Sequence, residues 1–164
     1  MLQILFAALA FSPVILCYSL PQWQELNCEA NHKYFFSDST LNWQDAREVC
    51  ELYGGWLLSI NSLQEQNCLV RHAMTAVHHG WFWHDATDKE TESIYVHAKD
   101  NSDLTWVPHR WRCGSTNNIY TDIDDYLLIG LFGDTHSETG AWCARQETIK
   151  TYYICEGLIS NIDS

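Results

Sequence analysis

The stretch WQDAREVCELYGGWLLSI, residues 43–60, decides the fold. Its first part places apolar and small side chains on one stripe at the helical period, which predicts an amphipathic helix; these residues are Trp43, Ala46, Val49, Cys50 and Tyr53. Asn42 stands where it can cap the start of this helix, and Gly54 and Gly55 supply the left-handed residue that ends one. The apolar run WLLSI then predicts a short strand.

The chain after this stretch predicts one more helix and a set of strands. Ser62 and Glu65 have the spacing of a capping box, so a second helix is expected to begin there and to run to about Val77. Polar loops separate the aromatic and β-branched runs FWHDAT (82–87), LTWVP (104–108), DYLLIGL (125–131) and TYYICE (151–156). Two helices followed by an antiparallel sheet define the α+β class.

The N-terminal segment predicts secretion. Residues 1–19 carry no charged side chain, and the apolar run is too short and too interrupted by proline for a membrane span. We expect a signal peptide over 1–19 that is cleaved after Ser19, with Cys17 as the next choice and a retained signal anchor as the alternative. The secreted product would be a single domain over 20–164, without membrane insertion.

Composition and motifs exclude two classes of function. The chain has a net charge of -12, and its nine lysines and arginines form no basic stripe, so nucleic acid is not an expected partner. No nucleophile elbow, phosphate-binding glycine loop or cysteine nucleophile signature occurs, so we do not expect an enzyme. The acidic excess is interpreted as a solvated surface that keeps a secreted protein soluble.

Four stretches, in this order, resemble the C-type lectin-like domain family. WQDAREVCELYGGWLLSI is similar to the family's first helix and strand, and SLQEQNCLV (62–70) to the start of its second helix. WHDATD (83–88) resembles its core strand, and TYYICE its closing strand with the terminal cysteine. The resemblance covers about residues 27–156 and implies two helices packed on antiparallel sheets, with a long loop and stapling disulfides.

The cysteine count agrees with a disulfide framework. Cys17 lies in the predicted signal peptide, which leaves an even number of cysteines in an oxidising compartment. The resemblance implies that Cys50 pairs with Cys155. Such a bridge closes a loop of roughly 100 residues, for which the chain-entropy model gives about 4 to 5 kcal/mol of stabilisation.

The family's calcium site is degraded in this sequence. That site is a calcium ion held by an EPN or QPD triplet in the long loop and by a WND motif on the neighbouring strand. The matching positions are Ser115, Thr116 and Asn117 in the loop and Trp142, Cys143 and Ala144 on the strand. Because calcium takes several carboxylate oxygens and a thiol is a poor ligand for a hard cation, we expect no metal, no cofactor and calcium-independent behaviour.

The same alignment implies an altered set of disulfides. Tyr126 and about Glu147 occupy the places of the family's inner cysteine pair. Cys113 and Cys143 then meet across the lost metal site and are expected to pair, so that a covalent link replaces the ionic one. An alternative alignment treats Cys143 as the inner cysteine displaced by an insertion, and it leaves Cys113 as the nearest partner all the same.

Cys28 and Cys68 would pair by elimination within this scheme. The alternative is a buried free Cys68, with Cys28 linking two chains.

Three further groups contain metal-ligating residue types without the spacing of a metal site. Two are acidic and are interpreted as polar loops, because they lack the glycine and distal glutamate of an EF-hand. The third is a histidine run without the HEXXH spacing, interpreted as a helix end that leads into a strand. In chain order the groups are His78, His79, His84 and Asp85; Asn117, Asn118, Asp122, Asp124 and Asp125; and Asp134 and Glu138.

The predicted function is a secreted recognition module that binds carbohydrate or another extracellular ligand without the usual calcium site. The alternative is a calcium-independent module for a protein or surface, with no sugar activity, and the fold does not choose between them. No oligomeric state is predicted. Planar polar groups beside aromatic rings suit a sugar, so the candidate ligand-binding residues are Trp111, Ser115, Thr116, Asn117, Asn118, Asp122, Asp124, Asp125 and Trp142. The alternative interpretation of the tryptophans is core packing.

Overall fold

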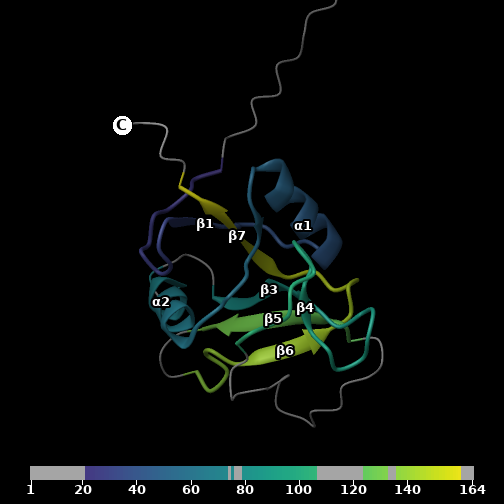
Figure 1. The fold of residues 1–164 in the computed structure, drawn as a ribbon. Coiled ribbons are helices and arrows are strands. Elements are labelled where there is room, and N and C mark those ends of the chain that lie inside the picture. Colours follow the sequence, from purple (N-terminus) through teal and green to yellow (C-terminus); the bar gives the residue numbers. More distant parts are fainter. Residues whose placement is uncertain (1–20, 74, 76–78, 107–123, 133–135, 160–164) are drawn as a thin grey trace, which may run out of the picture.

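The computed structural model describes residues 21–73, 75, 79–106, 124–132 and 136–159. The predicted signal peptide therefore lies outside the described residues. In chain order the elements are β1 (His32–Phe36), α1 (Trp43–Leu52), β2 (Trp56–Leu57), α2 (Leu63–Ala73), β3 (Gly80–Thr87), β4 (Val96–His97), β5 (Tyr126–Leu131), β6 (Trp142–Arg145) and β7 (Tyr152–Leu158). Figure 1 shows α1 and α2 on opposite sides of the sheet. No helix in the described part of the chain is long and apolar enough to cross a membrane.

Helix α1 follows the prediction from the sequence. The side chain of Asn42 accepts a hydrogen bond from the backbone N–H of Asp45 at 2.8 Å, which caps the helix start. Gly54 has a φ of +79°, which glycine adopts without strain at a helix end. At Gly55 a Cβ would lie 2.3 Å from the carbonyl oxygen of Glu156, so this position requires glycine for the close approach of β7.

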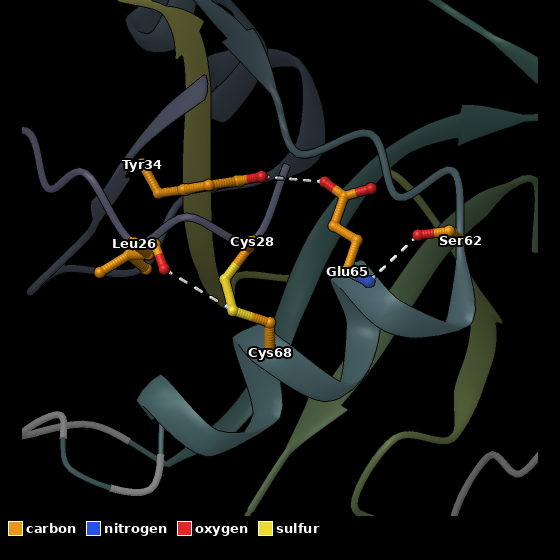
Figure 2. Close-up of a disulfide and its surroundings, with 6 residues drawn as sticks. All are labelled: Leu26, Cys28, Tyr34, Ser62, Glu65 and Cys68. Carbon is orange, nitrogen blue, oxygen red and sulfur yellow. Dashed lines mark hydrogen bonds between the residues drawn. A yellow bond between two sulfur atoms is a disulfide. The ribbon is translucent and has the colours of Figure 1, made fainter. Parts of the chain in front are cut away.

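Helix α2 is shorter than predicted and has half of the expected capping box. It ends at Ala73, and Thr75 lies in a turn whose N–H donates to the carbonyl of His72. Ser62 Oγ accepts a hydrogen bond from the Glu65 N–H at 3.1 Å, as expected. The Glu65 carboxylate does not return to Ser62 but turns inward, where it accepts from Tyr34 (Figure 2).

The strands form one mixed sheet in the order β1-β7-β3-β5-β6, with β2 also on β7 and β4 also on β3. All pairings between named strands are antiparallel except that between β3 and β7, so the expectation of purely antiparallel sheets is corrected at one pairing. The chain leaves β3, passes through β5 and β6, and returns so that β7 runs in the same direction as β3. The α+β class and the lectin-like arrangement are confirmed.

Two strand predictions differ from the structure. Residues 104–106 of the predicted strand 104–108 form no strand, and the other two lie outside the described residues. The Trp106 ring instead packs edge-on against Trp142, with 5.5 Å between ring centroids, so side-chain packing holds this segment. Strand β1, which no pattern predicted, pairs with β7 along its whole length.

Two predicted disulfides are present. Cys50–Cys155 joins α1 to β7, and both residues are fully buried. Cys28–Cys68 joins the N-terminal segment to α2 (Figure 2), so the alternative of a free Cys68 is wrong.

Cys143 is also disulfide-bonded. The other four described cysteines pair with one another, so its partner lies outside the described residues. Cys113 is there too, and its pairing with Cys143 stays a prediction.

Candidate functional site

Most of the predicted ligand-binding residues lie outside the described part of the chain. These are Trp111, Ser115, Thr116, Asn117, Asn118 and Asp122. His78 and Asp134, which belong to the groups with metal-ligating residue types, also lie outside it. Asp124 and Asp125 lead into β5 and are half-buried, and the Asp125 carbonyl accepts a hydrogen bond from the Asp88 N–H at 3.1 Å. The structure thus anchors the C-terminal end of the predicted binding loop to the turn after β3.

The three residues that the sequence alignment matched to the family's WND motif are all buried in β6. Trp142 is fully buried, its Nε1 donates to Gln66 Oε1 at 2.8 Å, and its ring lies 4.5 Å from that of His84. Cys143 is disulfide-bonded, and Ala144 has no polar side-chain atom. The burial of Trp142 places its ring among core side chains, so the described residues give no support to a direct ligand contact by this tryptophan.

A hydrogen bond joins Tyr126 and Glu147, the two residues that the sequence alignment matched to the family's inner cysteine pair. Tyr126 OH donates to Glu147 Oε2 at 3.3 Å, and the side chain of Lys89 also hydrogen-bonds Tyr126. The Tyr126 ring packs on Trp43 of α1 with 4.6 Å between centroids. Burial raises the pKa of Tyr126, which keeps its hydroxyl protonated and able to donate.

Removing this hydroxyl should have a measurable cost. We expect Tyr126→Phe to lower the free energy of unfolding by about 1 kcal/mol, because Glu147 loses a donor while the ring packing is kept. Urea denaturation measures the change. The matched control is Tyr53→Phe, since the Tyr53 hydroxyl makes no hydrogen bond to a described residue and its loss should be near neutral. Equal losses in both variants would show that the Tyr126–Glu147 contact contributes nothing specific.

A cleft of about 370 Å³ lies beside this pair and is named here the α1–β5 cleft. Its lining comes from the first turns of α1, the segment between 87 and 101, and Tyr126 at the start of β5. Gln44, Arg47 and Lys89 supply polar and charged groups, and Ile94 and Val96 supply apolar surface. An apolar surface with a few convergent polar groups is the usual composition of a small-ligand site.

Two carboxylates are fully buried, Glu156 of β7 and Glu65 of α2. Glu156 accepts hydrogen bonds from Trp56 Nε1 at 3.1 Å and from the Ser59 N–H at 2.9 Å, and it pairs with His32 Nδ1 at 2.5 Å. Glu156 is therefore the acceptor that ties β1 and the chain after β2 to β7.

Glu65 is the second of these carboxylates and has no basic partner in the described contacts. Its two oxygens accept from Tyr34 OH at 3.1 Å and from the Asn61 N–H at 2.9 Å. Burial, and next the negative charge of Glu156, raise the pKa of Glu65 to about 7. All four oxygens of the two carboxylates thus have protein hydrogen-bond partners, so the pair is satisfied without a cation.

Two other clusters resemble chemical sites but do not have the required geometry. Cys28 Sγ, Cys68 Sγ and a His72 nitrogen lie within 4.8 Å of one another, yet the two sulfurs are bonded together and are not thiolate ligands.

The second cluster contains a serine, a histidine and an aspartate. Ser59 Oγ lies 3.0 Å from His97 Nδ1, and Asp85 Oδ2 lies 3.9 Å from the same nitrogen. In a catalytic triad the serine and the acid contact opposite nitrogens of the imidazole ring. Ser59 is moreover fully buried, and Lys99 Nζ donates to its hydroxyl at 2.8 Å. The cluster is a buried polar network and not a nucleophile with its base.

The fold defines a lectin-like domain, and comparison with known proteins gives its family. Residues 39–157 match the family model described as Lectin C-type domain, so the chain belongs to this family. A perlucin-like protein of Mytilus galloprovincialis is 30% identical over 100 residues, covering 57% of this chain and 63% of that protein. Asialoglycoprotein receptor 2 of Rattus norvegicus is 28% identical over 125 residues, covering 73% and 40%. The chain thus spans less than two thirds of the length of both relatives.

Solved structures with the same fold include proteins with different properties. The mouse scavenger receptor C-type lectin carbohydrate-recognition domain superposes with a TM-score of 0.64 at 24% identity, covering 87% of this chain and 98% of that one. A calcium-independent type II antifreeze protein superposes with a TM-score of 0.63 at 17% identity, covering 87% and 95%. At these identities the likeness shows the fold alone.

Proposed function

We propose that this domain is a secreted, non-enzymatic recognition module that binds carbohydrate or another extracellular ligand without calcium. The observation that carries the proposal is the state of β6, where Trp142, Cys143 and Ala144 are buried and Cys143 is in a disulfide. Calcium needs several oxygen ligands, and these three side chains supply none. The calcium-independent antifreeze protein shows only that this fold is compatible with calcium independence.

Glycan-array binding in millimolar calcium and in chelator tests this function. We expect the same glycans to be bound at the same strength in both conditions. Binding that appears only with calcium would contradict calcium independence. No glycan binding in either condition, with capture of an extracellular protein by the same preparation, would favour the alternative of a protein-binding module.

Thermal stability should also be independent of calcium. An ion that binds only the native state at a hundredfold excess over its Kd stabilises by about 2.7 kcal/mol, which would raise the melting temperature by several degrees. We expect no change in the melting temperature between millimolar calcium and chelator. A reproducible rise would reveal a retained metal site, and loss of that rise in Glu65→Gln would place the site at the Glu65–Glu156 pair and not in the long loop.

A further inference from the structure

The α1–β5 cleft combines an aromatic floor with an open apolar wall. Trp43 and Tyr126 are among its lining residues but are almost fully buried, so they form a rigid base. Ile94 is 56% exposed, and Val96, two residues further along the chain, is half-buried. The cleft therefore offers a firm, partly apolar surface large enough for one or two saccharide rings.

Two cations line this cleft from different elements. Arg47 comes from α1, where its Nε contacts Glu51 Oε1 at 3.0 Å and its guanidinium lies 5.8 Å from the centre of the Trp43 ring. The two terminal nitrogens of Arg47 make no hydrogen bond to a described residue, so this planar donor fork is available. Lys89 comes from the turn after β3, is exposed, and hydrogen-bonds Tyr126, which also lines the cleft.

Uncharged polar groups add directional hydrogen bonding to these charges. Gln44 uses its Nε2 to donate to Glu48 Oε1 at 2.8 Å, which leaves its carbonyl oxygen to accept from a hydroxyl. Asn101, whose backbone has a φ of 60°, also lines the cleft. Planar amides that donate and accept side by side suit the adjacent hydroxyls of a sugar.

The charge of the cleft is opposite to that of the chain. The full chain carries a net charge of -12, while the lining residues include Arg47 and Lys89 against Glu90; outside the lining, Glu51 contacts Arg47 and Glu147 lies near Lys89. A local excess of positive charge attracts an anionic group. Because the surrounding acidic surface repels anions, this group has to be small enough to reach the cleft without extensive contact with that surface.

We propose that the α1–β5 cleft binds an anionic saccharide, with the carboxylate or sulfate of the sugar between Arg47 and Lys89 and the sugar ring against Ile94. The proposal rests on the proposed function, since it names the ligand class of a calcium-independent recognition module. It moves the binding site from the loop that the sequence indicated to a surface built by α1, the turn after β3 and β5. Guanidinium and ammonium groups bind carboxylates and sulfates through charge-assisted hydrogen bonds.

Isothermal titration in chelator with three tetrasaccharides tests the ligand class. The probes are a heparin-derived tetrasaccharide with sulfate and carboxylate, a hyaluronan tetrasaccharide with carboxylate alone, and a neutral chitin-derived tetrasaccharide. We expect at least one anionic probe to bind about tenfold more tightly than the neutral one, and its binding to weaken as salt is raised. Binding of both anionic probes would show that a carboxylate suffices, and binding of the heparin probe alone would assign the contact to sulfate. Equal binding of all three probes, or no binding of either anionic probe, would overturn the proposal.

Charge-matched variants locate the site. Arg47→Gln and Lys89→Gln should each weaken binding of the anionic probe by about tenfold or more, whereas Arg47→Lys should retain part of it because the charge stays and the planar fork is lost. Arg71→Gln is the control, because it makes the same change in net charge on α2, on the other side of the sheet (Figure 1). Near-equal loss in Arg71→Gln, or wild-type binding in both cleft variants, would exclude this site. In the latter case, calcium-independent binding of the sugar elsewhere would leave the proposed function intact. Melting curves of each variant verify folding.

Discussion

Replacing Cys50 and Cys155 together by alanine should lower the free energy of unfolding by about 4 to 5 kcal/mol. The bridge spans 105 residues of sequence, and the chain-entropy model gives roughly this value for a loop of such length. Small domains are stable by only about 5 to 15 kcal/mol in total, so the variant should lose most of its folded population at physiological temperature. Urea denaturation followed by near-ultraviolet circular dichroism measures the loss.

The position of this bridge adds to its expected effect. Cys50 lies on the buried face of α1 and Cys155 lies in β7, so the bridge links the first helix covalently to the strand that comes last in the chain. The comparison variant replaces Cys28 and Cys68 by alanine. That bridge spans only 40 residues and ties the N-terminal segment to α2, so we expect a smaller loss with the tertiary signal retained. A loss under about 1 kcal/mol for the Cys50 and Cys155 pair would contradict the loop-closure account.

The sequence predicts the fold best where one short stretch contains all the determinants. Helix α1 has its cap, its apolar stripe and its terminal glycine within about a dozen residues, so local rules suffice. Strand β1 was missed because HKYFF has no regular alternation, and its formation depends on pairing with β7, which is more than 100 residues away in the chain. A pairing at that separation leaves no local signal in a single sequence.

The candidate site was less predictable than the fold. The degraded calcium motif indicated the β6 positions, but the cleft is made of single residues from three separate segments, and none of them forms a motif. From the sequence pattern alone, Arg47 is one polar residue of an amphipathic helix, and Lys89 is one polar residue of a loop. Only the packing of α1 beside the turn after β3 brings them to one cavity.

The histidine run shows the same limit in the core. His84 lies in β3, as the predicted strand 82–87 implies, but the sequence gives no sign of the role of its ring. The structure places its ring fully buried, with the N–H groups of Ile60 and Ala86 each 3.0 Å from a ring nitrogen. A neutral imidazole has one N–H, so it accepts only one of these hydrogen bonds at a time. Burial lowers the pKa of His84, which keeps the ring neutral in the folded domain.

Buried ionisable groups of both signs make the stability depend on pH in two opposing ways. Burial raises the pKa of Asp85 to about 7, and the hydrogen bond with Glu156 raises that of His32, so these groups favour folding at lower pH. Burial lowers the pKa of His84 and of His97, so their stabilising contribution is lost as the pH falls below the ordinary value of 6.5. The pH dependence of the unfolding free energy of the wild type is the sum of these contributions. A variant that removes one titrating group is needed to measure one contribution by itself.

Glu65→Gln isolates one of these acidic contributions. The folded-state pKa of Glu65 is about 7 against an ordinary value of 4.5, so the folded domain holds a proton that the unfolded chain has released between these values. Stability from Glu65 is therefore present below about pH 4.5 and is lost as the pH rises to about 7, by roughly 3 kcal/mol. Glutamine does not titrate, and the other groups titrate in both proteins. The stability of the variant relative to wild type should thus rise by roughly 3 kcal/mol from pH 4.5 to pH 8, whatever its constant offset from the altered hydrogen bond with Asn61. Denaturation curves at several pH values measure this difference, with Glu48→Gln on the exposed face of α1 as the control, for which no such rise is expected.

A stability difference that stays flat across this pH range would mean that Glu65 is ionised at neutral pH in the folded domain. The burial of Glu65 and the negative charge of Glu156 oppose that ionisation.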